Sequence, residues 1–230
     1  MTLKVSRISK KYDSQQVLNE VSISVNKGEI VGFLGPNGAG KSTTMKIITG
    51  CLFADDGFVE IGNFNMDKNP LEAKALVGYL PENNPLYDDM YIAEYLEYVA
   101  KLYPGMNAVA DKVKEVISLT GLQPEVHKKI ANLSKGYRQR VGLAQAMIHN
   151  PELLILDEPL SGLDPNQIEE FNHLLSEMSK EKAILLSSHT LSEVEAICTR
   201  IIIINQGKIM IDQPMSEIEN LTELFKNKTI

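Results

Sequence analysis

The chain has 230 residues, 43% of them hydrophobic, which is enough to bury the core of one large domain. A formal net charge of −7 argues against a nucleic-acid surface as the main partner, and two cysteines argue against a disulfide framework. Because neither a signal-peptide segment nor an apolar run long enough to cross a bilayer is found, we expect a reduced, cytosolic protein. We interpret Cys51 and Cys198 as small buried apolar residues.

The first third of the chain predicts strands around one short helix. Residues 3–12 and 17–25 alternate in hydropathy, which is typical of two paired strands, and the polar residues 13–16 form the turn between them. The apolar run Ile30–Leu34 predicts a buried strand, and residues 41–49 predict a helix with Met45 and Ile48 on its inner side. Further strands are expected at residues 58–61 and up to Leu80, before Pro81.

The middle of the chain predicts helices. Between Tyr91 and Thr120, apolar residues recur at helical spacing in two groups, which Pro104 and Gly105 separate. Another helix is expected after Ser134. We interpret residues 83–150 as a helical lobe inserted into an α/β core that residues 1–82 and 151–230 form.

The last third returns to alternating strands and helices. Residues 153–156 are apolar on both faces, as in a central parallel strand, and a helix at 165–180 and a strand at 183–187 follow. Thr190 and Glu193 predict a capping box that opens a helix up to Cys198. A hairpin around Gln206 and Gly207 and short helices over 215–230 complete an α/β fold whose ligand site lies at the carboxyl edge of the sheet.

The loop between the strand at 30–34 and the helix at 41–49 predicts a phosphate-binding site. It fills the P-loop pattern G-x-x-x-x-G-K-[ST], called Walker A, with Gly35, Gly40, Lys41 and Ser42. Glycines let backbone N–H groups approach phosphate oxygens, and the helix N-terminus adds partial positive charge. We expect Lys41 to reach the β- and γ-phosphates of a nucleotide and Ser42 to ligate Mg²⁺. The predicted contacts are Gly35, Pro36, Asn37, Gly38, Ala39, Gly40, Lys41, Ser42 and Thr43.

Other interpretations of these residues remain open. The loop could be a flexible glycine-rich turn, although its place between a strand and a helix favours phosphate binding. A dinucleotide-binding loop fits less well, because Gly32, Gly35 and Gly38 are spaced G-x-x-G-x-x-G. Tyr12 is either an aromatic on an edge strand or a side chain that stacks on adenine.

Asp157 and Glu158 follow the predicted strand 153–156 directly, in the position called Walker B. Adjacent carboxylates repel each other unless a cation is near, and Mg²⁺ would resolve the repulsion. We expect Asp157 to hold the metal, mostly through water, and Glu158 to polarise the water that attacks the γ-phosphate. The alternative is a solvated pair that caps the helix after Pro159.

Further motifs follow the P-loop. They are Leu-Ser-Lys-Gly-Tyr-Arg-Gln-Arg at 133–140, Asp-Glu-Pro-Leu-Ser-Gly-Leu-Asp at 157–164, and His189. With them the chain resembles the ATP-binding subunit of an ABC transporter over essentially its full length. The resemblance implies a P-loop ATPase core with a mixed sheet, an antiparallel β subdomain and an inserted helical lobe. It also implies ATP and Mg²⁺ as cofactors and Tyr12 as the adenine-stacking residue.

The resemblance assigns further site residues. It implies a signature loop at Ser134, Lys135, Gly136 and Tyr137, a D-loop from Ser161 to Asp164, and a switch histidine at His189, which could otherwise be a polar helix cap. Ser134 and Gly136 open a helix, and this offers a second phosphate-binding N-terminus. We interpret His127, His149 and His173 as surface residues.

The P-loop and the signature loop each precede a helix N-terminus, and they lie on distant lobes. This indicates a homodimer that encloses each ATP between the P-loop of one chain and the signature loop of the other. The resemblance implies separately encoded transmembrane permease subunits and a location on the inner face of the cell membrane, with no nucleic-acid partner. We expect the loop from Glu82 to Tyr91, with the helical lobe, to contact the permease.

Two features depart from the family pattern. Glu82 stands where the family has a glutamine, and it could still bind Mg²⁺ but cannot donate a hydrogen bond. The signature loop is Ser-Lys-Gly-Tyr instead of Ser-Gly-Gly-Gln. Both features are similar to bacterial ABC-2 type exporters, and the runs 78–87 and 134–145 are similar to gliding-motility-associated ATP-binding subunits. The alternatives are a soluble ABC ATPase that acts on nucleic acid or the ribosome, and a P-loop kinase.

Overall fold

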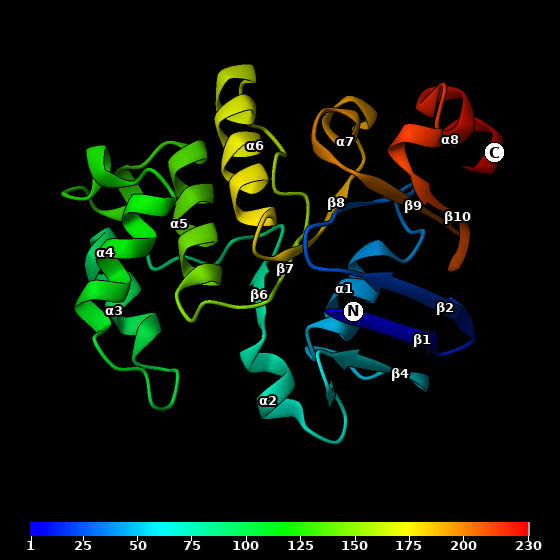
Figure 1. The fold of residues 1–230 in the computed structure, drawn as a ribbon, viewed down its shortest axis with the longest axis horizontal. Helices are drawn as coiled ribbons and strands as arrows, with labels where there is room; N and C mark the ends of the chain where they lie inside the picture. The colour runs from blue at the N-terminus through cyan, green and yellow to red at the C-terminus, as the bar shows by residue number, and fades with distance from the viewer. Residues whose placement is uncertain (230) are drawn as a thin grey trace.

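The computed structural model describes residues 1–229 and contains two β-sheets with helices packed around them (Figure 1). The strands are β1 (Leu3–Tyr12), β2 (Gln15–Val25), β3 (Ile30–Leu34), β4 (Asp56–Ile61), β5 (Phe64–Asn65), β6 (Val77–Leu80), β7 (Leu153–Leu156), β8 (Ala183–Ser188), β9 (Arg200–Asn205) and β10 (Lys208–Pro214). The helices are α1 (Lys41–Ile48), α2 (Pro70–Ala75), α3 (Ile92–Ala100), α4 (Val109–Leu119), α5 (Lys135–Met147), α6 (Pro165–Ser179), α7 (Leu191–Ile197) and α8 (Leu221–Thr229), with short 3₁₀ turns at Gln123–Glu125, Ile130–Asn132 and Met215–Glu217.

The larger sheet has six strands in the order β10-β9-β3-β8-β7-β6, all parallel except β10. The smaller sheet is antiparallel, in the order β2-β1-β4-β5. Helices α3, α4 and α5 gather at one end of the molecule, on the left in Figure 1, and the antiparallel sheet lies at the other. The predicted α/β fold, with a mixed sheet, an antiparallel sheet and a group of helices, is confirmed.

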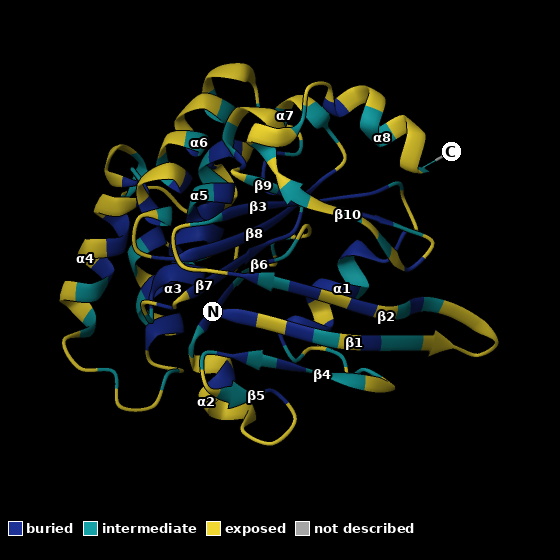
Figure 2. Cartoon of the chain, turned by 45° about the vertical axis from the view of Figure 1, so that its right-hand side comes forward, coloured by how far each residue is buried: buried dark blue, intermediate teal, exposed yellow. Residues whose placement is uncertain are grey.

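The central strands β3, β7 and β8 are buried along their whole length, because both of their faces are covered (Figure 2). Along β7, Leu154 and Leu156 join the core beneath the helices, whereas Leu153 and Ile155 join the core shared with the antiparallel sheet. All four side chains are fully buried. Because successive side chains of a strand point to opposite faces, one short apolar run contributes to both cores and holds the carboxyl edge of the sheet rigid.

Three local predictions are wrong in detail. Strand β2 begins at Gln15, so the preceding turn is shorter than residues 13–16, and β4 begins at Asp56 and not at residue 58. The capping box at Thr190 does not form, because the Thr190 side chain makes no capping hydrogen bond. The Ser188 hydroxyl takes this place: it accepts from the Thr190 N–H at 3.0 Å and donates to Glu193 at 2.7 Å.

The two cysteines differ in environment. Cys198 is buried, as predicted, and burial raises the pKa of its thiol to about 12, which keeps it protonated. Cys51 is exposed, so its prediction as a buried residue is wrong. The reason is that α1 ends at Ile48, so Cys51 lies in the connection to β4 and not on the buried face of the helix.

Helices α3, α4 and α5 bury their apolar faces against one another and against β6 and β7. Strand β5 and helix α2 have no counterpart in the prediction, because two and six residues are too few for a periodic pattern. The division into a lobe at residues 83–150 and a core formed by the rest stays a prediction. Within residues 1–229, no helix has both the length and the apolar character that a membrane span requires.

Candidate nucleotide-binding site

The glycine-rich loop connects the end of β3 to the start of α1. Gly38 and Gly40 have φ angles of 79° and 112°, in the left-handed region that favours glycine. Gly35 is required for a different reason, since a Cβ atom there would lie 2.3 Å from the backbone oxygen of Ile204. The loop therefore presses against β9 and leaves its N–H groups unobstructed by side chains at these positions.

The Lys41 side chain is held inside this loop. The residue is buried, and its ammonium group donates to the backbone oxygen of Gly35 at 2.7 Å and to that of Pro36 at 3.4 Å. The positive charge thus lies at the centre of the ring of backbone groups, where a phosphate would meet it.

Asp157 brings the end of β7 next to the start of α1. Its Oδ1 accepts a hydrogen bond from the Ser187 hydroxyl at 2.6 Å and a longer one from the Ser42 hydroxyl at 3.5 Å. The carboxyl ends of β3, β8 and β7 lie side by side in the parallel sheet, so residues distant in sequence meet at its edge.

Glu158 has φ of 50°, an uncommon conformation for a residue with a side chain. Its N–H donates to the Ser187 hydroxyl at 2.9 Å, while its Oε2 lies 2.7 Å from Nδ1 of His189. The two neighbouring carboxylates therefore have different partners, Ser187 and Ser42 for Asp157 and His189 for Glu158. The Glu158 side chain is only 10% exposed, whereas that of His189 is 59% exposed.

Several of these residues line an open cavity of about 450 Å³. That volume lies within the range of small-molecule sites. The predicted residues that line it are Tyr12, Asn37, Gly38, Gly40, Lys41, Ser42, Thr43, Glu82, Glu158 and His189. Gln15 and Val17 also line it, and sequence reasoning missed both, because nothing in the pattern of β2 shows that its first residues face the P-loop.

Other predicted residues do not line this cavity. Gly35, Pro36 and Ala39 belong to the loop itself, and Asp157 lies behind Ser42. Ser134, Gly136, Tyr137 and Asp164 are elsewhere, and Lys135 lines a second cavity of about 440 Å³, which Glu82 and Glu158 also border. Ser134 caps α5, accepting from the Tyr137 N–H at 3.4 Å, as expected for a residue that opens a helix.

The oxygen donors at the sheet edge fit Mg²⁺. Ser42 and Asp157 offer a hydroxyl and a carboxylate within hydrogen-bond reach of each other, and Glu82 adds a carboxylate on the wall of the cavity. Mg²⁺ in such sites is held by few protein oxygens together with substrate phosphates. Residues 1–229 contain no cluster of three His, Cys, Asp or Glu side chains able to hold a metal by themselves.

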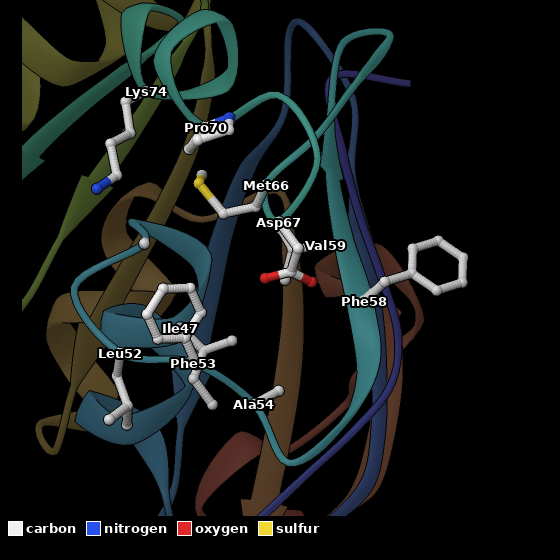
Figure 3. A pocket seen from close by; sticks show the side chains of 11 residues that line it. Ile47, Leu52, Phe53, Ala54, Phe58, Val59, Met66, Asp67, Pro70 and Lys74 are labelled. Carbon is white, nitrogen blue, oxygen red and sulfur yellow. The ribbon is translucent and has the colours of Figure 1, made fainter.

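A smaller cavity of about 40 Å³ lies between the end of α1, β4 and α2 (Figure 3). Ile47, Phe53, Met66 and Lys74 are among its lining residues, and no residue of the P-loop borders it. It is too small for a nucleotide, and the cavity of about 450 Å³ that the P-loop lines is the candidate nucleotide site.

Comparison with known proteins agrees with this geometry. Residues 18–161 match the family model described as ABC transporter. YdbJ of Bacillus subtilis (strain 168), an uncharacterized ABC transporter ATP-binding protein, is 38% identical over 224 residues, which are 96% of this chain and 72% of YdbJ. The bacitracin transport ATP-binding protein BcrA of Bacillus licheniformis is 37% identical over 219 residues, 94% of this chain and 71% of BcrA.

A solved structure of the ATP-binding subunit of an ABC transporter superposes with a TM-score of 0.85 at 31% identity, covering 98% of this chain and 95% of that one. The family model covers more than half of the chain, and the relatives align with nearly all of it. The chain therefore belongs to the ATP-binding subunits of ABC transporters.

Proposed function

We propose that this chain is the ATP-hydrolysing motor subunit of an ABC-2 type exporter. ATP hydrolysis coupled to transport is the activity expected of the family to which the chain belongs. The observation that carries the proposal is the 2.7 Å contact between Glu158 and His189 at the wall of a cavity that Lys41 and Ser42 also line. A carboxylate, an imidazole and the glycine-rich loop thus line one cavity, which supports the proposal.

Each of these residues has a proposed role. Tyr12, 46% exposed at the rim of the cavity, stacks on adenine. The loop N–H groups and Lys41 bind the phosphates, with Lys41 exchanging its carbonyl partners for phosphate oxygens. Glu158 accepts a proton from, or orients, the attacking water, and His189 holds that carboxylate and contacts the γ-phosphate.

Ser42, Asp157 and Glu82 are the proposed holders of Mg²⁺, which neutralises charge on the β- and γ-phosphates when bound. Asp157 acts mostly through water, and its bond from Ser187 fixes its orientation. Glu82 replaces the usual amide by a carboxylate, so it can accept hydrogen bonds from bound water but cannot donate one to phosphate.

The signature loop, residues 134–137, is proposed to complete the site of a second copy of the chain. Ser134 and Lys135 are exposed, they open α5, and neither lines the candidate nucleotide site. An exposed helix N-terminus favours an anion. In a head-to-tail homodimer this end would face the phosphates bound by the partner, and Asp164 of the D-loop would lie at the same interface.

The membrane partner is proposed to be a separately encoded permease that holds the chain at the inner face of the cell membrane. The contact surface is the Glu82 loop, residues 82–91, with the exposed face of the helical lobe at 83–150. Tyr87 and Tyr98 are exposed there, with ring centroids 5.6 Å apart. A role in transport is supported by the similarity to BcrA, a bacitracin transport ATP-binding protein. The further proposal of an exporter related to gliding-motility-associated subunits rests on the sequence of the runs 78–87 and 134–145 alone.

The substitution Glu158→Gln tests the motor. It keeps the size of the side chain but removes the carboxylate that activates water, so ATP turnover should fall roughly 10²-fold or more. ATP binding should persist, and the variant should accumulate as an ATP-dependent dimer in analytical ultracentrifugation. Near-normal turnover of this variant would refute the role given to Glu158.

A further inference from the structure

Arg138 lies in the first turn of α5, directly after the signature loop. Its backbone N–H donates to the backbone oxygen of Ser134 at 2.9 Å. One hydrogen-bonded turn of helix connects the two residues. Contacts that hold Arg138 in place therefore also set the direction in which Ser134 and the following N–H groups point.

The Glu82 loop contacts both the side chain and the backbone of Arg138. The guanidinium Nη1 donates to Oδ1 of Asp88 at 2.7 Å and to the backbone oxygen of Ile130 at 3.1 Å. The backbone oxygen of Arg138 accepts a hydrogen bond from the Asn84 side-chain amide at 3.0 Å. Asp88 and Asn84 both belong to the Glu82 loop, so two of its residues contact one residue of the signature helix.

Further contacts make the loop and the start of α5 one connected unit. The backbone N–H groups of Ile130 and Ala131, just before the signature loop, donate to the backbone oxygens of Met90 and Asp88 at 2.9 and 3.0 Å. Asn84 also packs against Gly142, where a Cβ atom would lie only 2.1 Å from its amide nitrogen. The absence of a side chain at Gly142 therefore allows the loop to lie directly on the helix.

We infer that Arg138 is a positioning residue that couples the Glu82 loop to the signature loop. The loop shifts when Glu82 responds to the nucleotide or when a partner binds the exposed tyrosines. In both cases the contacts of Arg138 to Asp88 and Asn84 move the first turn of α5 together with the loop. The inference rests on the proposed two-chain site, because only there does the direction of the signature loop matter.

The ion pair itself contributes little to folding. The side chains of Arg138 and Asp88 are 31% and 58% exposed, and pairs with this exposure have small effects on stability. Removing the charge of Asp88 should therefore leave the fold intact. We expect the substitution to weaken dimer closure instead, because the N-terminus of α5 would point in the wrong direction relative to the phosphates bound by the partner chain.

The test uses the full chain carrying Glu158→Gln, in which ATP-dependent dimerisation is measured by analytical ultracentrifugation across an ATP titration. Adding Asp88→Asn or Arg138→Gln should raise the ATP concentration for half-dimerisation by roughly fivefold, the scale of a partly exposed ion pair. Arg138→Lys keeps the charge and should stay close to the parent. Binding of a fluorescent ATP analogue to the monomer should not change, because neither residue lines the nucleotide site.

A matched control is Glu181→Gln, which removes another exposed ion pair, Lys27 with Glu181 at 2.8 Å, away from the loop. It should dimerise like the parent. Dimerisation of both Asp88→Asn and Arg138→Gln at the parent's ATP concentration would overturn the inference while the two-chain site stands. If the Glu158→Gln parent itself forms no dimer with ATP, the two-chain site fails, and the inference fails with it.

Discussion

At the scale of single residues, backbone conformation and hydrogen-bond partners decide what each carboxylate can do. Asp157 and Glu158 are neighbours in sequence, yet the left-handed φ of 50° at Glu158 lets the two side chains take different partners. In the proposed mechanism, Asp157 holds a metal beside Ser42, and Glu158 activates water beside His189. The glycines of the P-loop could be predicted because their motif is local, whereas the 2.7 Å contact of Glu158 with His189, 31 residues away, could not.

The prediction that His149 is a surface histidine is wrong. Its ring stacks on Tyr103 with centroids 4.2 Å apart, its Nε2 lies 3.0 Å from the backbone oxygen of Val77, and its Nδ1 is buried without a hydrogen-bond partner among residues 1–229. Burial lowers the pKa of His149 below its ordinary value of 6.5, with the nearby charge of Lys182 acting in the same direction.

A pH dependence of stability follows from this burial. Since the unfolded chain binds a proton at His149 more readily, the free energy of unfolding contains a contribution that is present above pH 6.5. It should be lost as the pH falls through the lowered pKa. Urea unfolding at pH 7.5 and pH 5, compared between the wild type and His149→Gln, measures this. The variant should lose less stability on acidification, and equal losses would contradict the assignment.

At the scale of elements, short apolar runs and turn residues were enough to locate most strands and helices. The predicted cap at Thr190 is wrong because of a local competitor: the Ser188 hydroxyl, two residues earlier, accepts from the Thr190 N–H and donates to Glu193. The Glu82 loop, in contrast, is held by tertiary contacts. It follows β6, it borders the candidate nucleotide site, and hydrogen bonds tie it to α5.

The Glu82 loop is also the proposed permease contact, which a charge reversal tests. Asp89 is exposed on this loop, and Asp89→Lys should reduce co-purification of a co-expressed transmembrane subunit by roughly tenfold, through like-charge repulsion or a lost ion pair. The ATPase rate of the isolated chain should not change. Glu219→Lys, an exposed reversal near the C-terminus, serves as the control. Unchanged co-purification and transport with Asp89→Lys would argue against this surface.

At the scale of the whole molecule, the P-loop and the signature loop open different helices, α1 and α5, and do not border the same cavity. We propose that one chain carries two separate halves of a phosphate site. In a homodimer with two-fold symmetry, the P-loop of each chain would face the signature loop of the other, which would give two complete sites.

This arrangement predicts the behaviour of Ser134→Arg. A long side chain at the exposed start of α5 should block closure of the dimer, so the ATP-dependent dimer of the Glu158→Gln chain should be lost. ATP binding to the monomer should persist, because Ser134 does not line the nucleotide site.

The control for Ser134→Arg is Asn220→Ala, which also removes a capping bond, from the Glu223 N–H at 3.0 Å, and costs about 1 kcal/mol of stability. It should dimerise normally. Dimers of Ser134→Arg at the parent's ATP concentration would mean that the signature loop lies outside the interface.

The sequence by itself determined the order of all strands and α-helices except β5 and α2, the P-loop and the family resemblance, since these depend on side-chain patterns within a few neighbouring residues. Only the tertiary structure decided which distant residues meet: Gln15 and Val17 with the P-loop, Asp157 with Ser42, Glu158 with His189, and Arg138 with Asp88. The physical reason is that a local period encodes which face of an element is buried. The element that covers that face is selected by packing of the whole chain.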